Sequence, residues 1–577
     1  MMHKLYAFSF LSMLLFYGTR AIAQSTSFER DPEHNTTATY EEVVNFYQQL
    51  DEQYKEAKLF TYGKTDVGKP LQVMVLSKDG DFDAKSIKQK GKSVILFNNG
   101  IHPGEPEGID ASMMLVRDML KEGRVPDRVV LCFILVYNID GMLNRGQSRV
   151  NQNGPRAYGF RGNRQNFDLN RDFIKSDSRN SKVFQTIFNA WDPDVFMDNH
   201  SSNGADYQYI MTLIDTQRDK LNPILAEYML KNYTQELYKR MEKEDYKLIP
   251  YVSFQGETPE SGIVAYLENP RYSTGYAALH NTIAYMPETH MWKPYEQRVQ
   301  STYSLMQHLI AITTEQGADL LKTRAAAKKA VQEQESFPLA WEVDTTKYSN
   351  IPFYGYEAAH EESEVSGLDR MYYDRSKPYT REIKLYDRYK PTITVQKPRA
   401  YVIPQAYEKV ISLLALNGVH LDTLARDTVI EAEMYYIKDF STGSMPYEGH
   451  YIHSKVQLES KRQQVPFYAG DVIVTTDQES NRYIVETLEP QAVDSYFNWN
   501  FFDAVLGQKE YFSSYIFEDE AARLLKEIPK LAEEFQKEKE RDPKFKANGR
   551  AQLDWIYKRS PYYEKTHMRY PIARCLP

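Results

Sequence analysis

The chain has 577 residues, of which 42% are hydrophobic and 26% are charged. This is an ordinary globular composition, and it excludes a disordered, collagen-like or low-complexity protein. The formal net charge is −8 and no long Lys/Arg block occurs, so we expect no nucleic-acid partner. The sequence leaves the oligomeric state open.

The first 23 residues have the pattern of a secretory signal peptide. Lys4 precedes an apolar run over residues 5–17, which is too short to span a membrane comfortably. Ala21 and Ala23 then form a small-residue cleavage signature before Gln24. We expect residues 1–23 to be removed, leaving a periplasmic or secreted protein without an integral membrane segment.

The first half of the chain alternates predicted strands and helices. Apolar runs predict strands over residues 71–76, 93–97, 129–136, 194–197, 207–213, 247–252 and 282–286. Apolar residues at helical spacing predict helices over residues 40–54, 108–120, 181–190, 222–242 and 296–321. This order predicts an α/β domain over residues 40–330, built on a mixed, mostly parallel sheet flanked by helices.

The pattern loosens over residues 331–378, which we interpret as a linker rich in aromatic and acidic residues. Short strands are predicted beyond it, over residues 380–386, 400–403, 427–437, 449–458 and 471–475, with helices over residues 405–416 and 518–540. Residues 379–577 are therefore expected to form a smaller α+β or β-rich accessory domain that acts as a scaffold or shapes the substrate site.

A candidate metal site follows two of the predicted strands. His102 and Glu105 come just after the strand over residues 93–97, and His200 comes just after the strand over residues 194–197. Ligands gather beyond the carboxyl ends of strands in open α/β sheets, so these three side chains should share one rim. Two histidines and one glutamate are the ligand set of catalytic zinc sites that keep a fourth position open for water. We expect one Zn²⁺ per chain.

Hydrolysis also requires a proton acceptor and donors for the developing oxyanion. Glu288 follows the predicted strand over residues 282–286, which places its carboxylate on the same rim. Arg161 and the segment 168–171 (Asp-Leu-Asn-Arg) occupy a loop rich in Gly and Asn before the helix over residues 181–190. A guanidinium can bind a substrate carboxylate through two hydrogen bonds, but many arginines are only solvated, so the residues alone leave this role open.

Taken together, these motifs resemble the carboxypeptidase A-like zinc metallocarboxypeptidase family over roughly residues 40–320. The motifs that carry the resemblance are, in chain order, His102-x-x-Glu105, Asn138-Ile139-Asp140-Gly141, Phe160-Arg161-Gly162-Asn163, Asp168-Leu169-Asn170-Arg171, His200-Ser201 and Glu288. The resemblance implies a mixed, mostly parallel sheet between helices and an enzyme that removes C-terminal residues from a peptide substrate; with the signal peptide, this predicts an exported enzyme.

The resemblance also implies a role for each site residue. His102, Glu105 and His200 would bind zinc, and Glu288 would act first as general base and then as general acid. Arg161 would polarise the scissile carbonyl, and Asn170 with Arg171 would hold the terminal carboxylate. Asp168 would orient a zinc histidine, His102. Tyr266 would cap the substrate, with Tyr272 and Tyr276 as alternatives.

One position departs from the family pattern, which has Asn where this chain has Asp172, directly after the carboxylate-binding pair. Asp172 adds a negative charge that would pair with Arg171 if the two met. Three other functions stay open: a zinc amide hydrolase of N-acyl amino acids, as in aspartoacylase-like enzymes; a peptidoglycan-type peptidase; and a non-catalytic peptide-binding protein on a peptidase fold. The residue that sets side-chain preference is not identified.

Overall fold

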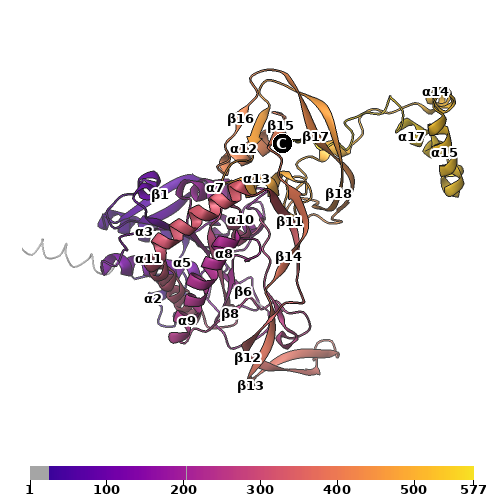
Figure 1. Cartoon of the computed structure of the whole chain (residues 1–577). Helices are drawn as coiled ribbons and strands as arrows, with labels where there is room; N and C mark the ends of the chain where they lie inside the picture. The colour runs from indigo at the N-terminus through magenta and orange to yellow at the C-terminus, as the bar shows by residue number, and fades with distance from the viewer. Residues whose placement is uncertain (1–24, 203, 577) are drawn as a thin grey trace, which may run out of the picture.

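A mixed sheet forms the centre of the N-terminal half of the computed structural model, which describes residues 25–202 and 204–576 (Figure 1). Its strand order is β1-β2-β4-β3-β5-β10-β7-β8, with β6 beside β10. The strands are β1 (Ala57–Lys64), β2 (Pro70–Leu76), β3 (Ser93–Asn98), β4 (Val129–Ile134), β5 (Val195–Asp198), β6 (His200–Ser202), β7 (Met211–Asp215), β8 (Leu248–Pro250) and β10 (Ile283–His290). Strands β4, β3, β5 and β10 run parallel, so their carboxyl ends meet at one edge.

Helices cover this sheet, as the sequence predicted. Helix α11 packs against α5 and over β3 and β4, α7 packs against β1, and α10 packs against β5 and β10. Every residue of β3 and β4 is buried, which explains their uninterrupted apolar sequences. The helices are α2 (Ser27–Arg30), α3 (Tyr40–Gln53), α4 (Ala84–Gln89), α5 (Glu107–Lys121), α6 (Ile139–Leu143), α7 (Arg179–Trp191), α10 (Ser273–Leu279) and α11 (Tyr295–Glu333). The predicted α/β fold class is thereby confirmed.

Some predicted boundaries were wrong. The helix expected over residues 222–242 comprises α8 (Pro223–Met229), a π-helical turn (Leu230–Thr234) and α9 (Gln235–Lys243) in succession. The strand expected over residues 207–213 begins only at Met211, because the preceding tyrosines pack elsewhere. Tyr207 bridges Gly355, and Tyr209 Oη donates to the carbonyl of Pro352 at 3.1 Å.

Residues 331–378 do not form the expected linker. After α11 ends, β11 (Ser336–Val343) pairs with β14 (Tyr389–Gln396), and β12 (Ser349–Glu362) forms a long hairpin with β13 (Asp369–Tyr386). The end of β13 also pairs with β9 (Ile263–Val264), which ties the hairpin to the N-terminal half. Most residues of the hairpin are partly or fully exposed, so the sequence lacks the apolar alternation that identifies a half-buried strand.

The C-terminal half contains an antiparallel sheet of order β16-β19-β15-β20-β17-β18. Its strands are β15 (Ala400–Ile403), β16 (Asp422–Thr423), β17 (Thr428–Thr442), β18 (His453–Phe467), β19 (Val472–Thr475) and β20 (Ala573–Cys575), with helices α12 (Glu408–Leu416) and α13 (Asn481–Leu488) beside them. Strand β20, near the end of the chain, lies between β15 and β17. The predicted β-rich C-terminal region is confirmed, whereas its division from the rest as a separate domain stays a prediction.

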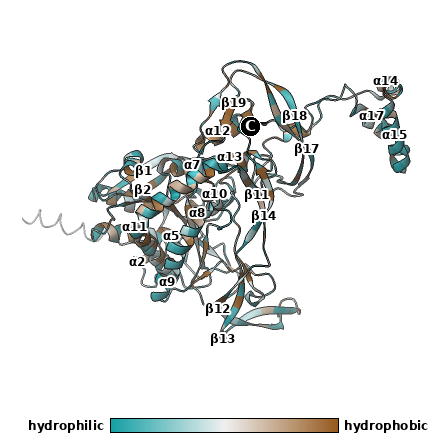
Figure 2. Cartoon of the chain, in the orientation of Figure 1, coloured by the Kyte–Doolittle hydropathy of each residue, from teal (hydrophilic) through white to brown (hydrophobic). Residues whose placement is uncertain are grey.

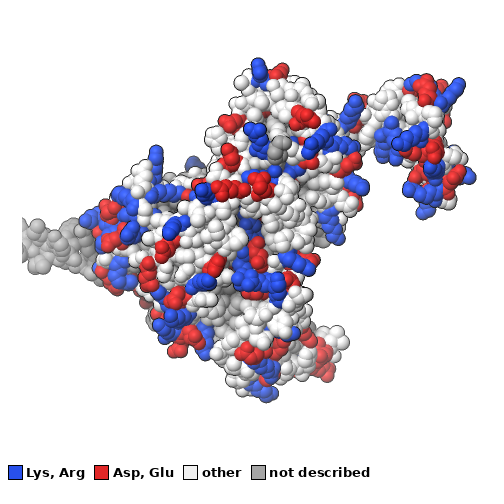
Figure 3. Space-filling view, viewed as in Figure 1, with Lys and Arg blue, Asp and Glu red and all other residues white. Residues whose placement is uncertain are grey.

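A helical cluster projects from this sheet (Figure 1). It comprises α14 (Ser514–Glu527), α15 (Pro529–Arg541), α16 (Pro543–Lys546) and α17 (Gly549–Tyr557), and it has a small apolar core of its own. The single helix predicted over residues 518–540 is therefore broken, because Pro529 cannot continue the preceding helix. The outward faces of this cluster are hydrophilic (Figure 2), and both signs of charge are interspersed over the visible surface of the molecule (Figure 3).

The predicted signal peptide lies outside the described residues. Within residues 25–202 and 204–576, none of the helices combines the length and apolar character needed to cross a membrane.

Candidate metal centre and its pocket

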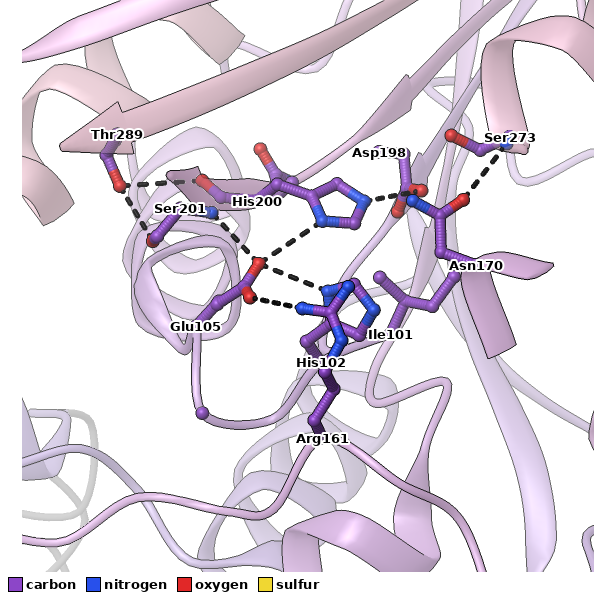
Figure 4. A network of polar contacts seen from close by, with 12 residues as sticks. Ile101, His102, Glu105, Arg161, Asn170, Asp198, His200, Ser201, Ser273 and Thr289 are labelled. Atoms are coloured by element: carbon purple, nitrogen blue, oxygen red, sulfur yellow. Dashed lines mark hydrogen bonds and ion pairs between the residues drawn. The ribbon is translucent and has the colours of Figure 1, made fainter. Parts of the chain in front are cut away.

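Three candidate ligands meet at the carboxyl edge of the sheet, as the sequence predicted. His102 and Glu105 lie in the loop between β3 and α5, and His200 begins β6 directly after β5. Glu105 Oε2 lies 3.3 Å from His102 Nδ1 and 3.2 Å from His200 Nδ1 (Figure 4). All three side chains are buried, and their ligand atoms lie within 4.8 Å of one another.

A carboxylate fixes the orientation of each histidine. His102 Nε2 donates to Asp168 Oδ1 at 2.8 Å, and His200 Nε2 donates to Asp198 Oδ2 at 2.9 Å. With Nε2 bonded to a carboxylate, each ring turns Nδ1 toward the shared centre. Carboxylate–histidine pairs of this kind set the tautomer and raise the basicity of histidines that bind metals.

The donor set fits zinc. Ligand atoms about 2.0–2.2 Å from a tetrahedral ion stand about 3.4 Å apart, close to the two nitrogen–oxygen distances observed here. Burial disfavours the charged form of Glu105, but the neighbouring charges of His102 and Arg149 hold the pKa of Glu105 well below its ordinary value. The carboxylate is therefore ionised and ready to bind a cation.

Gly108 allows the two halves of the site to approach. It lies in the first turn of α5, and a Cβ atom there would come within 2.4 Å of Asn199 Cβ. Asn199 directly precedes His200, so any larger residue at position 108 would push α5, and the loop that carries Glu105, away from β6. The absence of a side chain at this position thus sets the distance between Glu105 and His200.

Glu288, the predicted proton acceptor, lies beside the metal ligands. It is on β10, and its register partner on the parallel strand β6 is His200. Both residues line a pocket of about 210 Å³, which His102, Glu105 and Arg161 also line. Desolvation raises the pKa of Glu288 despite the opposing effect of His200, and the negative charge of Glu105 raises it further. A raised pKa suits a carboxylate that must accept and later return a proton.

The predicted arginines lie on the same pocket in different environments. Arg161 donates to Asp168 Oδ2 at 2.9 Å and to Glu105 Oε1 at 3.4 Å, beside the metal ligands. Arg171 lies over the ring of Tyr272, with its guanidinium carbon 4.5 Å from the ring centroid. Asn170 lines the same pocket, and its Oδ1 accepts a hydrogen bond from Ser273 N (Figure 4).

Asp172 does not pair with Arg171. Its carboxylate accepts hydrogen bonds from Lys175 Nζ at 2.6 Å and from Ser178 Oγ at 2.6 Å, and all of these groups are buried. Arg171 instead lies 3.8 Å from Asp168 and keeps donors facing the pocket. The negative charge that Asp172 adds is therefore neutralised by Lys175 and does not reach Arg171.

The tyrosine candidates differ in accessibility. Tyr266 is 36% exposed and lines the pocket, as does Tyr272. Tyr276 is completely buried, and its Oη donates to Asn417 Oδ1 at 2.6 Å, which removes it as a candidate for contacting substrate.

Sequence reasoning missed four acidic or basic residues around the site. Asp198 was detectable, since side chains two positions apart on an extended strand share a face and an acid therefore precedes His200 on its own side. Arg149, which donates to Glu105 Oε1 at 2.9 Å, comes from a loop without a motif. Glu268 is a buried acid lining the pocket, with Oε2 accepting from Thr274 N at 3.0 Å. Glu448 accepts from Asp168 N at 2.8 Å from a point 280 residues away in the sequence.

Two histidines and a glutamate around one centre, with a carboxylate and guanidinium groups on the same pocket, define a zinc peptidase type of site. Comparison with known proteins points to the same class: residues 43–259 match the family of zinc carboxypeptidases. The chain is thus an enzyme of the zinc metallocarboxypeptidase class.

Two relatives match a longer part of the chain than the family does, and both are carboxypeptidases. Carboxypeptidase 2 of Trichophyton tonsurans and that of Trichophyton equinum are each 19% identical over 453 residues, covering 75% of this chain and 78% of the relative. Among solved structures, the metallo-carboxypeptidase from Burkholderia cenocepacia matches with a TM-score of 0.36 and 15% identity, covering 49% of this chain and 70% of that one. Carboxypeptidase A from Helicoverpa armigera matches with a TM-score of 0.38 and 17% identity, covering 55% and 80%.

Proposed function

We propose that this protein is an exported zinc carboxypeptidase that hydrolyses the C-terminal peptide bond of its substrate. The single observation that carries the proposal is one pocket lined by the His102–Glu105–His200 centre, by Glu288 and by Arg171. A metal centre, a proton acceptor and a carboxylate-binding cation on one small cavity are the parts that C-terminal hydrolysis requires.

The residues divide the chemistry between them. When bound by His102, Glu105 and His200, zinc supplies Lewis-acid activation of water and of the scissile carbonyl. Glu288 takes the proton of the attacking water and returns it to the departing amine, so its proton count is restored at the end of the cycle. Arg161 donates to the carbonyl oxygen as negative charge develops there.

The terminal carboxylate is held by Asn170 and Arg171. A guanidinium binds a carboxylate through charge-assisted hydrogen bonds, and the stacked ring of Tyr272 restricts Arg171 to one orientation. Tyr266, on the same pocket and partly exposed, is the residue placed to close over a bound peptide. Asp168 accepts a hydrogen bond from His102 and another from Arg161, and so fixes these two side chains relative to each other.

The proposal of export depends on the sequence of residues 1–23. It can be tested by identifying the N-terminal residue of the mature protein. Edman or mass-spectrometric analysis should find Gln24 at the N-terminus of protein recovered from the periplasm or medium. Recovery of a chain that begins at Met1 from the cytoplasm would contradict export.

The exopeptidase activity is tested by matched peptides that end in a free acid or an amide. Wild-type enzyme should favour the acid, and Arg171→Ala should lower kcat/KM for the acid by about 10- to 100-fold while changing the amide little, because an amide accepts hydrogen bonds from a guanidinium more weakly. Arg164→Ala, an exposed arginine on the same loop, is the matched control and should leave both rates unchanged. A wild-type preference for the amide would replace this proposal with an endopeptidase or amidase.

A further inference from the structure

A second and larger cavity adjoins the catalytic pocket. It has a volume of about 680 Å³ and shares three wall residues with that pocket: Ile214, Tyr251 and Tyr266. This volume is within the range of about 300–1,000 Å³ that is usual for ligand sites, so it can hold more than a single small side chain. Nothing in the proposed mechanism uses it.

The lining of this cavity is mainly aliphatic and aromatic, with side chains that include Leu230, Tyr238, Ile249, Ile351, Tyr354 and Leu385. Several of its charged groups are already engaged. Arg218 lies 3.6 Å from Asp387, and Lys247 lies over the ring of Tyr354 at 4.1 Å. The chemistry of the cavity therefore favours a neutral, apolar or aromatic group over an ion.

A row of rings joins this cavity to the residue proposed to hold the substrate terminus. The rings of Tyr251 and Tyr266 have centroids 5.8 Å apart, and those of Tyr266 and Tyr272 are 6.1 Å apart. Arg171 lies on the far side of this row, against Tyr272. A peptide whose carboxylate is held by Arg171 would thus have the cavity within reach of the residues next to the cleaved bond.

One wall of the cavity lies outside the part of the chain that matches the zinc carboxypeptidase family. Ile351 and Tyr354 are on β12, and Leu385 is on β13. Pairing of Leu385 with Ile263 on β9, and the bridge between Gly355 and Tyr207, hold this wall against the catalytic half. The β12–β13 hairpin therefore completes a cavity that the residues matched to the family do not close by themselves.

We propose that this cavity is a substrate subsite that receives a bulky apolar or aromatic side chain of the peptide, at one of the two positions that flank the cleaved bond. This rests on the proposed carboxypeptidase function and specifies its substrate class. It also assigns the β12–β13 hairpin a role in substrate selection.

The test compares N-acyl dipeptides with Phe or Ala at each of the two positions in turn. Wild-type enzyme should show a kcat/KM ratio of Phe to Ala of at least about tenfold at one position, since filling an apolar pocket changes rates by about 10- to 200-fold. Ile351→Trp fills the cavity from its β12 wall and should bring that ratio close to one. Asn350→Trp adds the same bulk at the adjacent exposed position and should keep the wild-type ratio.

A second variant and a binding measurement complete the design. If Ile351→Trp does not fold, Leu230→Trp fills the cavity from the helical wall and should have the same effect on the ratio. Calorimetric binding of the dipeptides to Glu288→Gln separates the subsite from the activity: binding that favours Phe and is lost in the Trp variants would support the subsite even without cleavage. Cleavage with no preference for Phe at either position, or a ratio unchanged by filling the cavity, would overturn the proposal.

Discussion

Asp198→Asn should weaken zinc binding without altering any candidate ligand. Asp198 is completely buried and accepts two hydrogen bonds, one from His200 Nε2 at 2.9 Å and one from Asn98 Nδ2 at 2.9 Å. Asparagine keeps the volume but removes the charge, and it offers an oxygen to only one of these two donors. His200 then loses either its acceptor or the negative charge that raises its basicity.

The expected size of the effect follows from the role of the carboxylate. Loss of such a partner typically costs about 10- to 100-fold in metal affinity, which corresponds to about 1.4–2.7 kcal/mol. Zinc Kd measured by competition with a chromogenic chelator should rise by this factor. At a fixed excess of zinc, the stabilisation of the fold by the metal should fall by the same free energy, as a smaller rise in Tm.

The matched control is Asp215→Asn. Asp215 ends strand β7 of the same sheet and accepts from Thr234 Oγ1, and among the described residues it has no hydrogen bond to a histidine. This variant should leave zinc Kd unchanged. A zinc Kd for Asp198→Asn within twofold of wild type, in a protein with native Tm in the absence of metal, would refute the argument that this carboxylate controls His200.

Two further variants test other parts of the site. Glu288→Gln should keep stoichiometric zinc but lower kcat by about 10²- to 10⁴-fold, because it removes the proton acceptor and leaves the ligands intact; near-native turnover would assign the proton transfer to another carboxylate. Glu448→Ala should lower kcat/KM several-fold by removing the acceptor of Asp168 N, whereas Glu448→Gln, which keeps an acceptor oxygen, should retain activity within about twofold. Equal losses in both variants of Glu448 would show that its charge, not its hydrogen bond, matters.

The metal centre could be placed from the sequence because its residues are coupled to strand ends. His102, His200 and Glu288 each follow an apolar run, and parallel strands bring their carboxyl ends to one edge of the sheet. The place of these residues in the sequence therefore predicted their place in the fold. Arg149 and Glu448 could not be predicted in this way. Arg149 lies in a loop and Glu448 lies in the connection between β17 and β18, and neither segment has a periodic apolar pattern.

The same reasoning explains where the fold was misread. The strands β3 and β4 were recognised because both of their faces are buried, which requires an uninterrupted apolar run. The β12–β13 hairpin was taken for a linker because few of its side chains are buried, so polar residues are tolerated along its length. A strand without a buried face has no apolar alternation in its sequence, although β12 and β13 pair along most of their length, with one break in register.

The C-terminal half contributes to the catalytic centre through the loop that carries Asp168 and Arg171. This loop has little regular structure of its own, only the short 3₁₀ turn Leu169–Arg171, so its conformation depends on contacts from outside. Glu448 accepts from its backbone, and both His450 and Lys409 contact Asp177 at 2.7 and 2.8 Å just beyond it. Ordering a flexible loop costs conformational entropy, and a site held in advance does not lose that free energy again when substrate binds. The loop between β17 and β18, together with α12, therefore preorganises the loop that carries Asp168, which bonds His102, and Arg171, which we propose as the group that receives the substrate terminus. The hairpin earlier in the chain closes the neighbouring cavity.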